Sequence, residues 1–528
     1  MPLKNAMKKF FLAGLLLCDI LCFDSAAGFD LVIRHGRVVD GTGNPAFFAD
    51  VAVKSGRIAA IGVITEKGRQ EMDAAGLIVA PGFIDVHTHA DDIFQQPLAE
   101  NFLRMGVTTL VVGNCGGSKL DLDRYFRDIA AKKVSVNIAT LIGHNTVREK
   151  VMGGDFDRAP TPAELAQMKS VVDRAMRDGA VGLSTGLIYL PGTFSRTEEI
   201  VELARSIKPY DGIYVSHMRH EDSDIFEALD EFTRVTREAE VRGEVSHIKL
   251  GGEPSWGQAD KVLTYLEKCR AGGLDITQDL YAYTASSTTL RKLIPDEAFD
   301  GGDAKCNALL ADSEQRKKLA EKIKERLQKR GRTDFSYAVI AAYKHDPTLN
   351  GLNIVEAAKK LHGSDSLDAQ VETIFEIQQH GSGSGVFHGM NEEDMEKFMR
   401  HPNTMIASDS GLYEFGQGVP HPRGYGNNAR VLGRYVRELK VLRLEDAVRK
   451  MTSLPANTFH FKQRGELREG NWADITLFDP EKISDPAIYG KPHQYAEGIP
   501  CVLVNGVVTI QDSRHTGAKA GVGLRNGR

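Results

Sequence analysis

The sequence has no basic cluster, no internal repeat and no low-complexity tract. Its formal net charge is −5, from 66 lysine and arginine residues against 71 aspartate and glutamate residues. Proteins that bind nucleic acid usually carry a clustered excess of positive charge, so no nucleic-acid partner is expected. With 26% charged and 42% hydrophobic residues, the composition is that of an ordinary globular protein. The 528 residues suffice for several domains, or for one large barrel with an attached module.

The sequence also lacks a disulfide pattern. Two of its six cysteines, Cys18 and Cys22, lie in the apolar N-terminal segment. The others are far apart in the chain: Cys115, Cys269, Cys306 and Cys501. This spacing argues against a disulfide-rich secreted scaffold. A lone cysteine such as Cys115, in "VTTLVVGNCGG", is most simply interpreted as a small buried apolar residue.

Long apolar runs are missing after the first thirty residues. Residues 1–27 contain three early lysines, an apolar run at 10–23 that only Asp19 interrupts, and the small residues Ser25–Ala27. This order predicts a secretory signal cleaved after Ala27, and therefore a secreted or periplasmic protein. The alternative is an uncleaved anchor at a membrane surface. Because the apolar run is short, no stable membrane span is expected.

Short strand-like runs at both ends of the chain predict a small β module. Residues 28–81 contain such runs, separated by glycine, asparagine and proline. Similar short strand-like runs occur in residues 456–528, in "ADITLFDP" and "CVLVNGVVTIQD". We expect the two parts to pair into one β-sandwich module beside a central domain.

Between these parts, residues 82–455 alternate strand-like and helical patterns. One helix is well marked: Thr161 can cap it, Pro162 suits its first position, Glu164 completes a capping box and Gly179 ends it. Strands that alternate with helices indicate βαβ units and a parallel sheet.

The candidate strands number eight, which is the number that closes a (β/α)8 barrel. They end at "DVHTHA", "VGNCGG", "LIGHN", "LSTGLIY", "VSHMRH", "VSHIKLGG", "DLYAYT" and "IASDSG". Polar and reactive residues stand at the carboxyl ends of these strands, where such barrels place their active sites. The sequence thus predicts an α/β fold, a TIM-like barrel. A helix-rich excursion at 285–389 comes before the last strand, and we expect it to form an inserted lid subdomain over the barrel mouth.

Histidines at these strand ends predict a metal site. His87 and His89 are two residues apart, so they face the same side of an extended strand. His217 and His247 each end a strand, thirty residues apart, which suits adjacent βα repeats. Asp409 ends the eighth strand, where a carboxylate can bind metal and transfer protons.

These features resemble the amidohydrolase superfamily, whose strand-end histidines and last-strand aspartate surround one or two divalent metals. Many members bridge the metals with a carboxylated lysine on strand four, but "GAVGLSTGLIYLPG" contains no lysine. A closer resemblance is to the D-aminoacylases, the N-acyl-D-amino-acid deacylases. It rests on "GNCG", "GLSTGLIY", "SHMR", "SHIK", "YAYTASST" and "HPRGYG" followed by "RVLGRYVRE".

The D-aminoacylase resemblance implies zinc as the cofactor, with one tight site and possibly a second, weaker one. It implies Cys115, His217 and His247 at the tight site. It places the following residues around the second site: His87, His89, Cys115 and Asp409. Asp409 would be the catalytic proton carrier: it would accept a proton from the attacking water and then donate it to the leaving amide nitrogen. The substrate would be a small molecule with a free carboxylate.

Arg423 in "PHPRGYG" has the forked side chain that suits such a carboxylate. The resemblance adds Lys249, Tyr281 and Ser287 to this group, although each has an ordinary alternative: a solvated lysine, a core tyrosine or a helix cap. One departure from the family concerns "SDSGLYEFGQGVPHPR", which has no histidine beside Asp409, so the preferred substrate is open.

Three alternative functions stay open. The first is a dipeptidase for substrates with a C-terminal D-residue, and the second is a hydantoinase-like cyclic amidohydrolase. The third is a metal-binding scaffold or solute receptor without activity. His144 and His388 are further candidates near the site without an assigned role, and the oligomeric state is not predicted.

Overall fold

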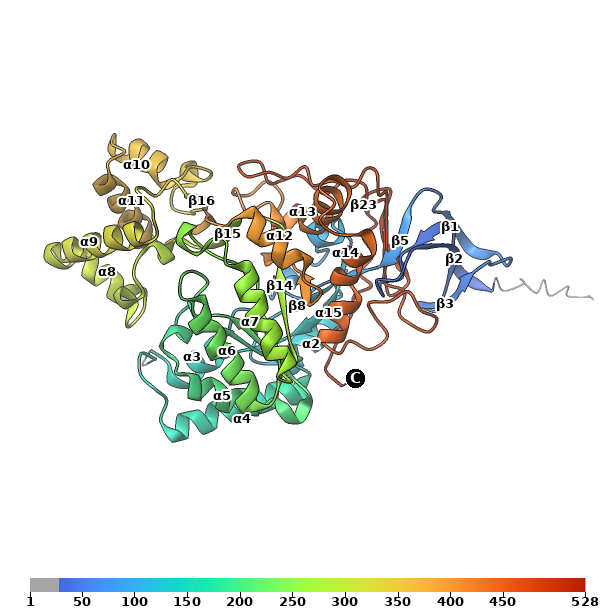
Figure 1. Cartoon of the computed structure of the whole chain (residues 1–528), viewed down its shortest axis with the longest axis horizontal. Helices are drawn as coiled ribbons and strands as arrows, with labels where there is room; N and C mark the ends of the chain where they lie inside the picture. Colours follow the sequence, from blue (N-terminus) through green and yellow to red (C-terminus); the bar gives the residue numbers. More distant parts are fainter. Residues whose placement is uncertain (1–27, 155, 528) are drawn as a thin grey trace, which may run out of the picture.

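The structure of the chain is a computed structural model that describes residues 28–154 and 156–527 (Figure 1). The predicted secretory segment lies outside these residues. Within the described ranges, no helix is both long enough and apolar enough to cross a membrane.

The centre of the molecule is an eight-stranded parallel barrel in the part of the chain that the structure describes. Its strands are β6 (Phe83–Asp85), β8 (Val107–Val112), β9 (Asn137–Thr140) with its continuation β10 (Ile142–Gly143), β11 (Gly182–Gly186), β12 (Ile213–His217), β13 (Arg242–Val245), β14 (Ile276–Leu280) and β18 (Thr404–Ile406). After β18, the short strand β19 (Ser410–Gly411) pairs in parallel with β7 (Thr88–His89) and so joins the last strand to the first. The TIM-like α/β barrel predicted from the sequence is confirmed.

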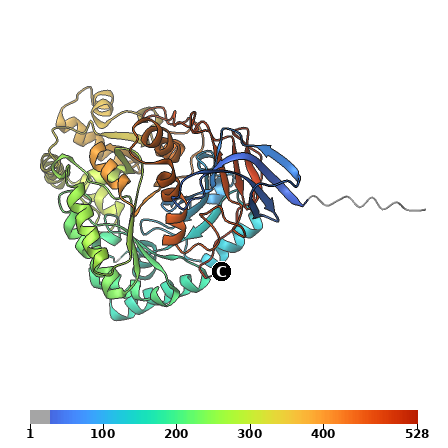
Figure 2. The same cartoon turned by 45° about the vertical axis from the view of Figure 1, so that its right-hand side comes forward.

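Helices surround these strands (Figure 2). They are α1 (Glu100–Leu103), α2 (Leu122–Lys132), α3 (His144–Met152), α4 (Pro162–Asp178), α5 (Thr197–Arg205), α6 (Ile225–Ala239), α7 (Ala259–Ala271), α12 (Glu392–Arg400), α13 (Arg423–Arg430), α14 (Leu444–Met451) and α15 (Ser453–Thr458). The predicted cap of α4 is confirmed, since the Thr161 side chain accepts a hydrogen bond from the backbone N–H of Glu164. Gly179 ends this helix with a φ of 116°, a left-handed conformation that a side chain would strain.

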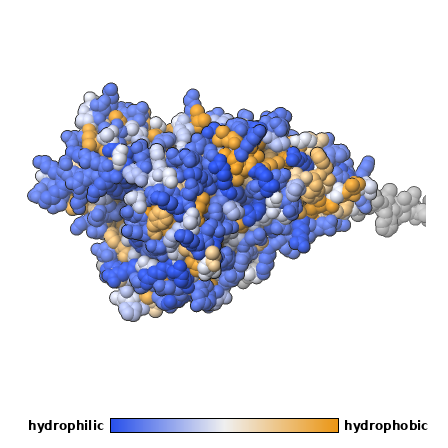
Figure 3. Space-filling view, viewed as in Figure 1, coloured by the Kyte–Doolittle hydropathy of each residue, from blue (hydrophilic) through white to orange (hydrophobic). Residues whose placement is uncertain are grey.

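The two ends of the chain meet in one sheet beside the barrel. It contains β1 (Phe29–Val38), β2 (Phe47–Lys54), β3 (Arg57–Gly62), β4 (Gly68–Asp73), β5 (Ile78–Pro81), β20 (Ile475–Phe478), β21 (Cys501–Val504), β22 (Val507–Gln511) and β23 (Arg514–His515). Strand β5 pairs antiparallel with β20, and this pairing links the halves. Apolar side chains from both ends, such as Ile33 and Leu503, share one buried cluster. Hydrophilic side chains cover most of the face in Figure 3, and hydrophobic ones gather toward the end that carries this sheet.

The chain between strands seven and eight forms a separate body. It holds a small antiparallel sheet of β15 (Ala285–Thr289), β16 (Ala338–Ala342) and β17 (Ser384–His388), with the helices α8 (Asp303–Ala311), α9 (Ser313–Lys329), α10 (Ile354–His362) and α11 (Leu367–Gln379). Its buried cluster includes Phe299, Ile323 and Phe375. The helical patterns predicted here are therefore confirmed. In Figures 1 and 2 this body lies at the opposite end of the molecule from the β1–β3 sheet.

Candidate metal centre and active site

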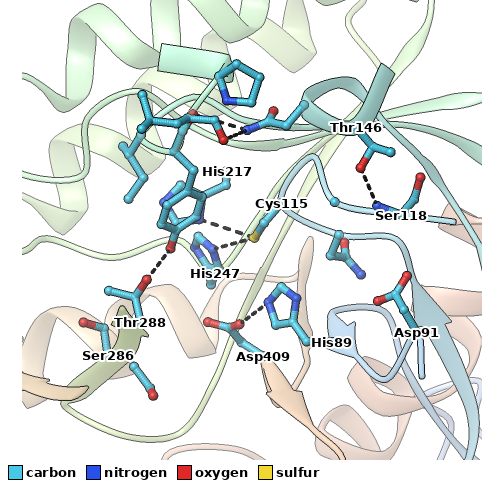
Figure 4. Close-up of a pocket in the computed structure, with 18 of the residues that line it drawn as sticks. His89, Asp91, Cys115, Ser118, Thr146, His217, His247, Ser286, Thr288 and Asp409 are labelled. Atoms are coloured by element: carbon cyan, nitrogen blue, oxygen red, sulfur yellow. Dashed lines mark hydrogen bonds and ion pairs between the residues drawn. The ribbon is translucent and has the colours of Figure 1, made fainter. Parts of the chain in front are cut away.

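A cavity of about 620 Å³ opens at the carboxyl ends of the barrel strands (Figure 4). Residues that follow β8, β12, β13 and β18 line it, together with β15 of the inserted segment. Because every barrel strand points the same way, side chains at their carboxyl ends converge on one region. The cavity therefore brings together residues that are far apart in the sequence.

Cys115 lies at the centre of this cluster. Its Sγ is 3.3 Å from His87 Nε2, 3.5 Å from His217 Nδ1 and 3.8 Å from His247 Nε2. Burial alone would raise the pKa of the thiol, but the neighbouring imidazoles outweigh it and lower the pKa well below its usual range. The surrounding imidazoles thus favour the thiolate form of the side chain. The interpretation of Cys115 as core packing is set aside by these neighbours.

The glycines of "NCGG" permit this placement. Cys115 has a φ of 51° and Gly116 a φ of 75°, so the chain turns sharply after β8. A Cβ on Gly116 would lie 2.2 Å from the side-chain oxygen of Asn145. Gly116 is therefore required for the close approach that points the thiol into the cavity.

Asp409 forms the second part of the site. Its Oδ1 lies 3.1 Å from His89 Nε2 and 3.7 Å from His87 Nε2, and its Oδ2 lies 3.0 Å from Arg423 Nη1. Burial would raise the pKa of this carboxyl group, but Arg423 and His89 lower it well below its usual range. Asp409 is therefore ionised at neutral pH. The same contact raises the pKa of His89 to about 10 against the opposing effect of burial.

The donor atoms suit a zinc ion. Zinc bonds of about 2.0–2.3 Å in a tetrahedral arrangement place neighbouring donors about 3.5 Å apart. The sulfur-to-nitrogen distances around Cys115 are 3.3–3.8 Å. The Nε2 atom of His217 is buried without a hydrogen-bond partner among the described residues. A thiolate with imidazoles and a carboxylate is the ligand chemistry that zinc prefers.

Two carboxylates outside the predicted set orient these imidazoles. Glu221 Oε1 lies 3.0 Å from His247 Nδ1, and Asp279 Oδ2 lies 3.3 Å from His87 Nδ1. Carboxylates in this position fix the ring orientation and the tautomer of metal-binding histidines. Sequence reasoning missed both. Glu221 stands four residues after His217 in "SHMRHE", and Asp279 stands at the end of strand seven. Only these positions near strand ends could have identified them from the sequence.

Burial governs the charge of these carboxyl groups. Glu244, on β13, is buried beside Asp279, and burial together with that neighbouring charge raises its pKa well above the usual range. For Asp279, burial would raise the pKa, but the hydrogen bond from Glu244 and the charge of His87 lower it. The proton therefore stays on Glu244, and Asp279 keeps its charge toward His87.

The four residues predicted to hold a carboxylate have different surroundings. Ser287 and Lys249 line the cavity, but Lys249 Nζ is engaged by Glu221 at 2.5 Å and by His247 Nδ1 at 2.8 Å. Arg423 and Tyr281 lie together behind Asp409, with the guanidinium 4.4 Å from the ring centre. Nε of Arg423 is buried without a hydrogen-bond partner in residues 28–154 and 156–527.

The two unassigned histidines do not join the metal cluster. His144 Nε2 lies 2.8 Å from the Glu199 carboxylate, which also binds the buried Arg148. His388 belongs to β17 of the inserted segment and packs against Tyr489, with ring centres 4.7 Å apart. The His388 side chain lines a second cavity, beside the first.

The barrel and its cluster of candidate metal ligands point to a class of protein: the chain belongs to the amidohydrolase family, whose model matches residues 70–510. It is 35% identical to the D-aminoacylase of Alcaligenes xylosoxydans xylosoxydans over 93% of this chain and 97% of that protein. It is 33% identical to the N-acyl-D-glutamate deacylase of the same organism, over 90% of this chain and 93% of that protein. The solved N-acyl-D-glutamate deacylase of Bordetella bronchiseptica, in complex with zinc and a phosphonate mimic of the tetrahedral intermediate, superposes with a TM-score of 0.81. It is 32% identical, over 94% of this chain and 99% of that one.

Proposed function

We propose that this protein hydrolyses the amide bond of N-acyl-D-amino acids and releases a carboxylate and a free D-amino acid. The observation that carries the proposal is the cluster of Cys115 with three imidazoles beside the ionised Asp409. The D configuration is supported by the names of the relatives. By the resemblance, Cys115 after the second barrel strand takes the role that a strand-four lysine has in many other amidohydrolases, and strand four, β11, has no lysine. This disfavours a hydantoinase-like enzyme.

We propose zinc as the cofactor. Cys115, His217 and His247 would hold one ion, and a second, weaker site would use His87, His89, Cys115 and Asp409. When bound, zinc lowers the pKa of water and polarises a carbonyl group. The two groups share Cys115, but only in the first does one carboxylate, Glu221, lie near both imidazoles, 3.0 Å from His247 Nδ1 and 3.8 Å from His217 Nε2. One ion is therefore expected to bind first.

Asp409 carries the proton in this scheme. Its carboxylate faces the cavity and is held by Arg423 and His89, so its orientation is fixed before substrate binds. It accepts the proton of the attacking water and passes it to the leaving nitrogen, which needs a proton to depart as an amine. A non-enzymatic binding protein has no use for such a group.

Arg423, Tyr281, Ser287 and Lys249 are proposed to hold the α-carboxylate of the substrate. Arg423 has a free buried Nε after its contact with Asp409, so one guanidinium can serve both groups. Lys249 and Ser287 line the cavity from the side of β13 and β15. This arrangement favours a linear substrate with a terminal carboxylate.

The zinc-loaded protein is tested with matched N-acetyl-D- and N-acetyl-L-amino acids, and the released amino acid is measured. We expect turnover of D substrates alone. Activity restricted to L substrates would contradict the proposed configuration, and hydrolysis of hydantoins alone would contradict the reaction.

The remaining parts of the chain have proposed roles as well. We propose that residues 285–389 are a lid, because β15 lines the cavity and the segment has its own core. The sheet from both ends of the chain is proposed as the β-sandwich module, with parts 28–81 and 456–528 beside the barrel of 82–455. We propose from residues 1–27 that the protein is exported to the periplasm or the medium. Sequencing the N-terminus of the purified protein tests this, because cleavage after Ala27 should leave Gly28 as the first residue.

A further inference from the structure

A second cavity of about 420 Å³ adjoins the metal-site cavity. The two share wall residues from the barrel and from β15: Ile188, Glu221, Lys249, Ser286 and Thr288. On the far side, the wall is formed by the inserted segment, including Tyr337, Phe387 and His388. A group bound at the metal site can therefore extend under the inserted segment without leaving the protein.

The charge of this second cavity is strongly biased. Six lysine and arginine side chains line it against three aspartate and glutamate side chains. Lys292 is paired with Asp296 at 2.7 Å, Arg219 with Glu231 at 3.0 Å, and Lys249 with Glu221 at 2.5 Å. These pairs neutralise three of the six lysine and arginine side chains.

Three arginines of the inserted segment have no such partner. In residues 28–154 and 156–527, no carboxylate lies within ion-pair distance of Arg326, Arg330 or Arg332. Arg326 has a long contact of 3.5 Å to the backbone oxygen of Ile294, and Arg332 donates to the backbone oxygen of His388 at 2.8 Å. Arg332 also lies over the Tyr337 ring, 4.3 Å from its centre, and the charge of Asp296 reaches Arg326 only at longer range. Guanidinium groups that lack a direct ion pair in a partly buried cavity are stabilised when an anion binds beside them.

We infer that the second cavity holds the side chain of the amino acid and that the preferred side chain is a carboxylate. This inference rests on the proposed function, because the α-carboxylate group fixes which half of the substrate faces the cavity. Lys249 and Ser287 belong to that group, and Lys249 and Ser286 form the shared wall. The amino-acid half of the substrate thus lies next to the arginines, and the acyl half points away from them. Arginine is well suited to bind such a carboxylate by paired hydrogen bonds.

The test compares N-acetyl-D-glutamate with N-acetyl-D-glutamine, which have nearly the same shape and differ in charge. We expect the zinc-loaded protein to show a kcat/KM at least tenfold higher for the glutamate substrate. This ratio corresponds to about 1.4 kcal/mol. Equal values for the two substrates overturn the inference while leaving the proposed function intact. If the protein hydrolyses neither of these substrates nor any other N-acyl-D-amino acid, the inference and the proposed function are both overturned.

Variants locate the effect. The ratio of kcat/KM for N-acetyl-D-glutamate to kcat/KM for N-acetyl-D-glutamine is measured in two single variants. Arg326→Gln and Arg330→Gln are each expected to lower this ratio at least fivefold. Lys329→Gln is the matched control: it removes the same charge from the last turn of α9, but Lys329 is exposed and does not line the cavity. Its ratio should equal that of the parent. A ratio unchanged in both arginine variants, at unchanged thermal stability, overturns the inference.

A further comparison separates side chain from acyl group. N-succinyl-D-glutamine carries its extra carboxylate on the acyl half, so it should gain no advantage over N-acetyl-D-glutamine. A tenfold preference for the succinyl substrate would place the arginines next to the acyl group and contradict the inference.

Discussion

Replacing Asp409 with asparagine removes one negative charge from the centre of the site and keeps the shape of the side chain. The backbone of Asp409 has a φ of 49°, a left-handed conformation that asparagine tolerates nearly as well as aspartate. The carboxamide of the variant cannot accept a proton from water at neutral pH. The substitution therefore tests proton transfer with little change in backbone strain.

The expected loss in kcat is about 10²–10⁴-fold, the usual contribution of a positioned general base. In free energy this is about 2.7–5.4 kcal/mol of activation barrier. The change also leaves the guanidinium of Arg423 buried, at 2% exposure, without its carboxylate. A loss of folding stability is expected too, so thermal unfolding and zinc content are measured on the same preparation.

The assay is the initial rate of amino-acid release from a saturating N-acetyl-D-amino acid. Asp92→Asn is the matched control, because Asp92 belongs to the loop after β7 and its side chain is 63% exposed. It should retain the parent kcat. If the Asp409→Asn protein is folded, retains the tightly bound zinc and keeps kcat within tenfold of the parent, Asp409 is not the proton carrier.

Three further predictions concern other residues. Cys115→Ser should lose tightly bound zinc, measured by metal analysis after dialysis, because a serine hydroxyl stays protonated where the thiol is held as a thiolate; unchanged zinc content would contradict the role of Cys115 as a ligand. Glu221→Gln should weaken zinc binding about 10–100-fold, because His247 loses the carboxylate that orients it; an unchanged dissociation constant in a competition titration would refute this. Glu199→Gln should lower the unfolding free energy at pH 7 by about 3–5 kcal/mol, because Arg148 stays buried without its charged partner.

The effect of Glu199→Gln should depend on pH. Burial would raise the pKa of Glu199, but His144 and Arg148 outweigh it and lower the pKa. A lowered pKa means that the ionised group stabilises the fold fully above its unfolded pKa of about 4.3, and that this stability is lost as pH falls through the folded value. The difference between parent and variant should therefore shrink below about pH 4. A constant difference from pH 7 to pH 3 would contradict this account. Glu198→Gln is the control for Glu199→Gln, because Glu198 is exposed. Cys269→Ser is the control for Cys115→Ser, because Cys269 lies outside the cluster of candidate metal ligands.

The sequence by itself determined the barrel and the position of its reactive residues along the strands. Strand and helix signals are local: the capping box of α4 and its terminal glycine need no tertiary contact to be recognised. The order of strand ends then placed His87, Cys115, His217 and Asp409 at one face, because parallel strands in a barrel all end there.

Only the tertiary structure decided which atoms meet. Glu221 and Asp279 reach the imidazoles of different strands, and no local pattern marks an acidic residue as the partner of a histidine so far away in sequence. The same holds for Arg423, whose contact with Asp409 depends on how α13 packs over the closing strands. The second cavity is the clearest case. Arg326, Arg330 and Arg332 lie in an inserted segment where basic residues on a helix indicate only a solvated face, and the fold places them around this cavity.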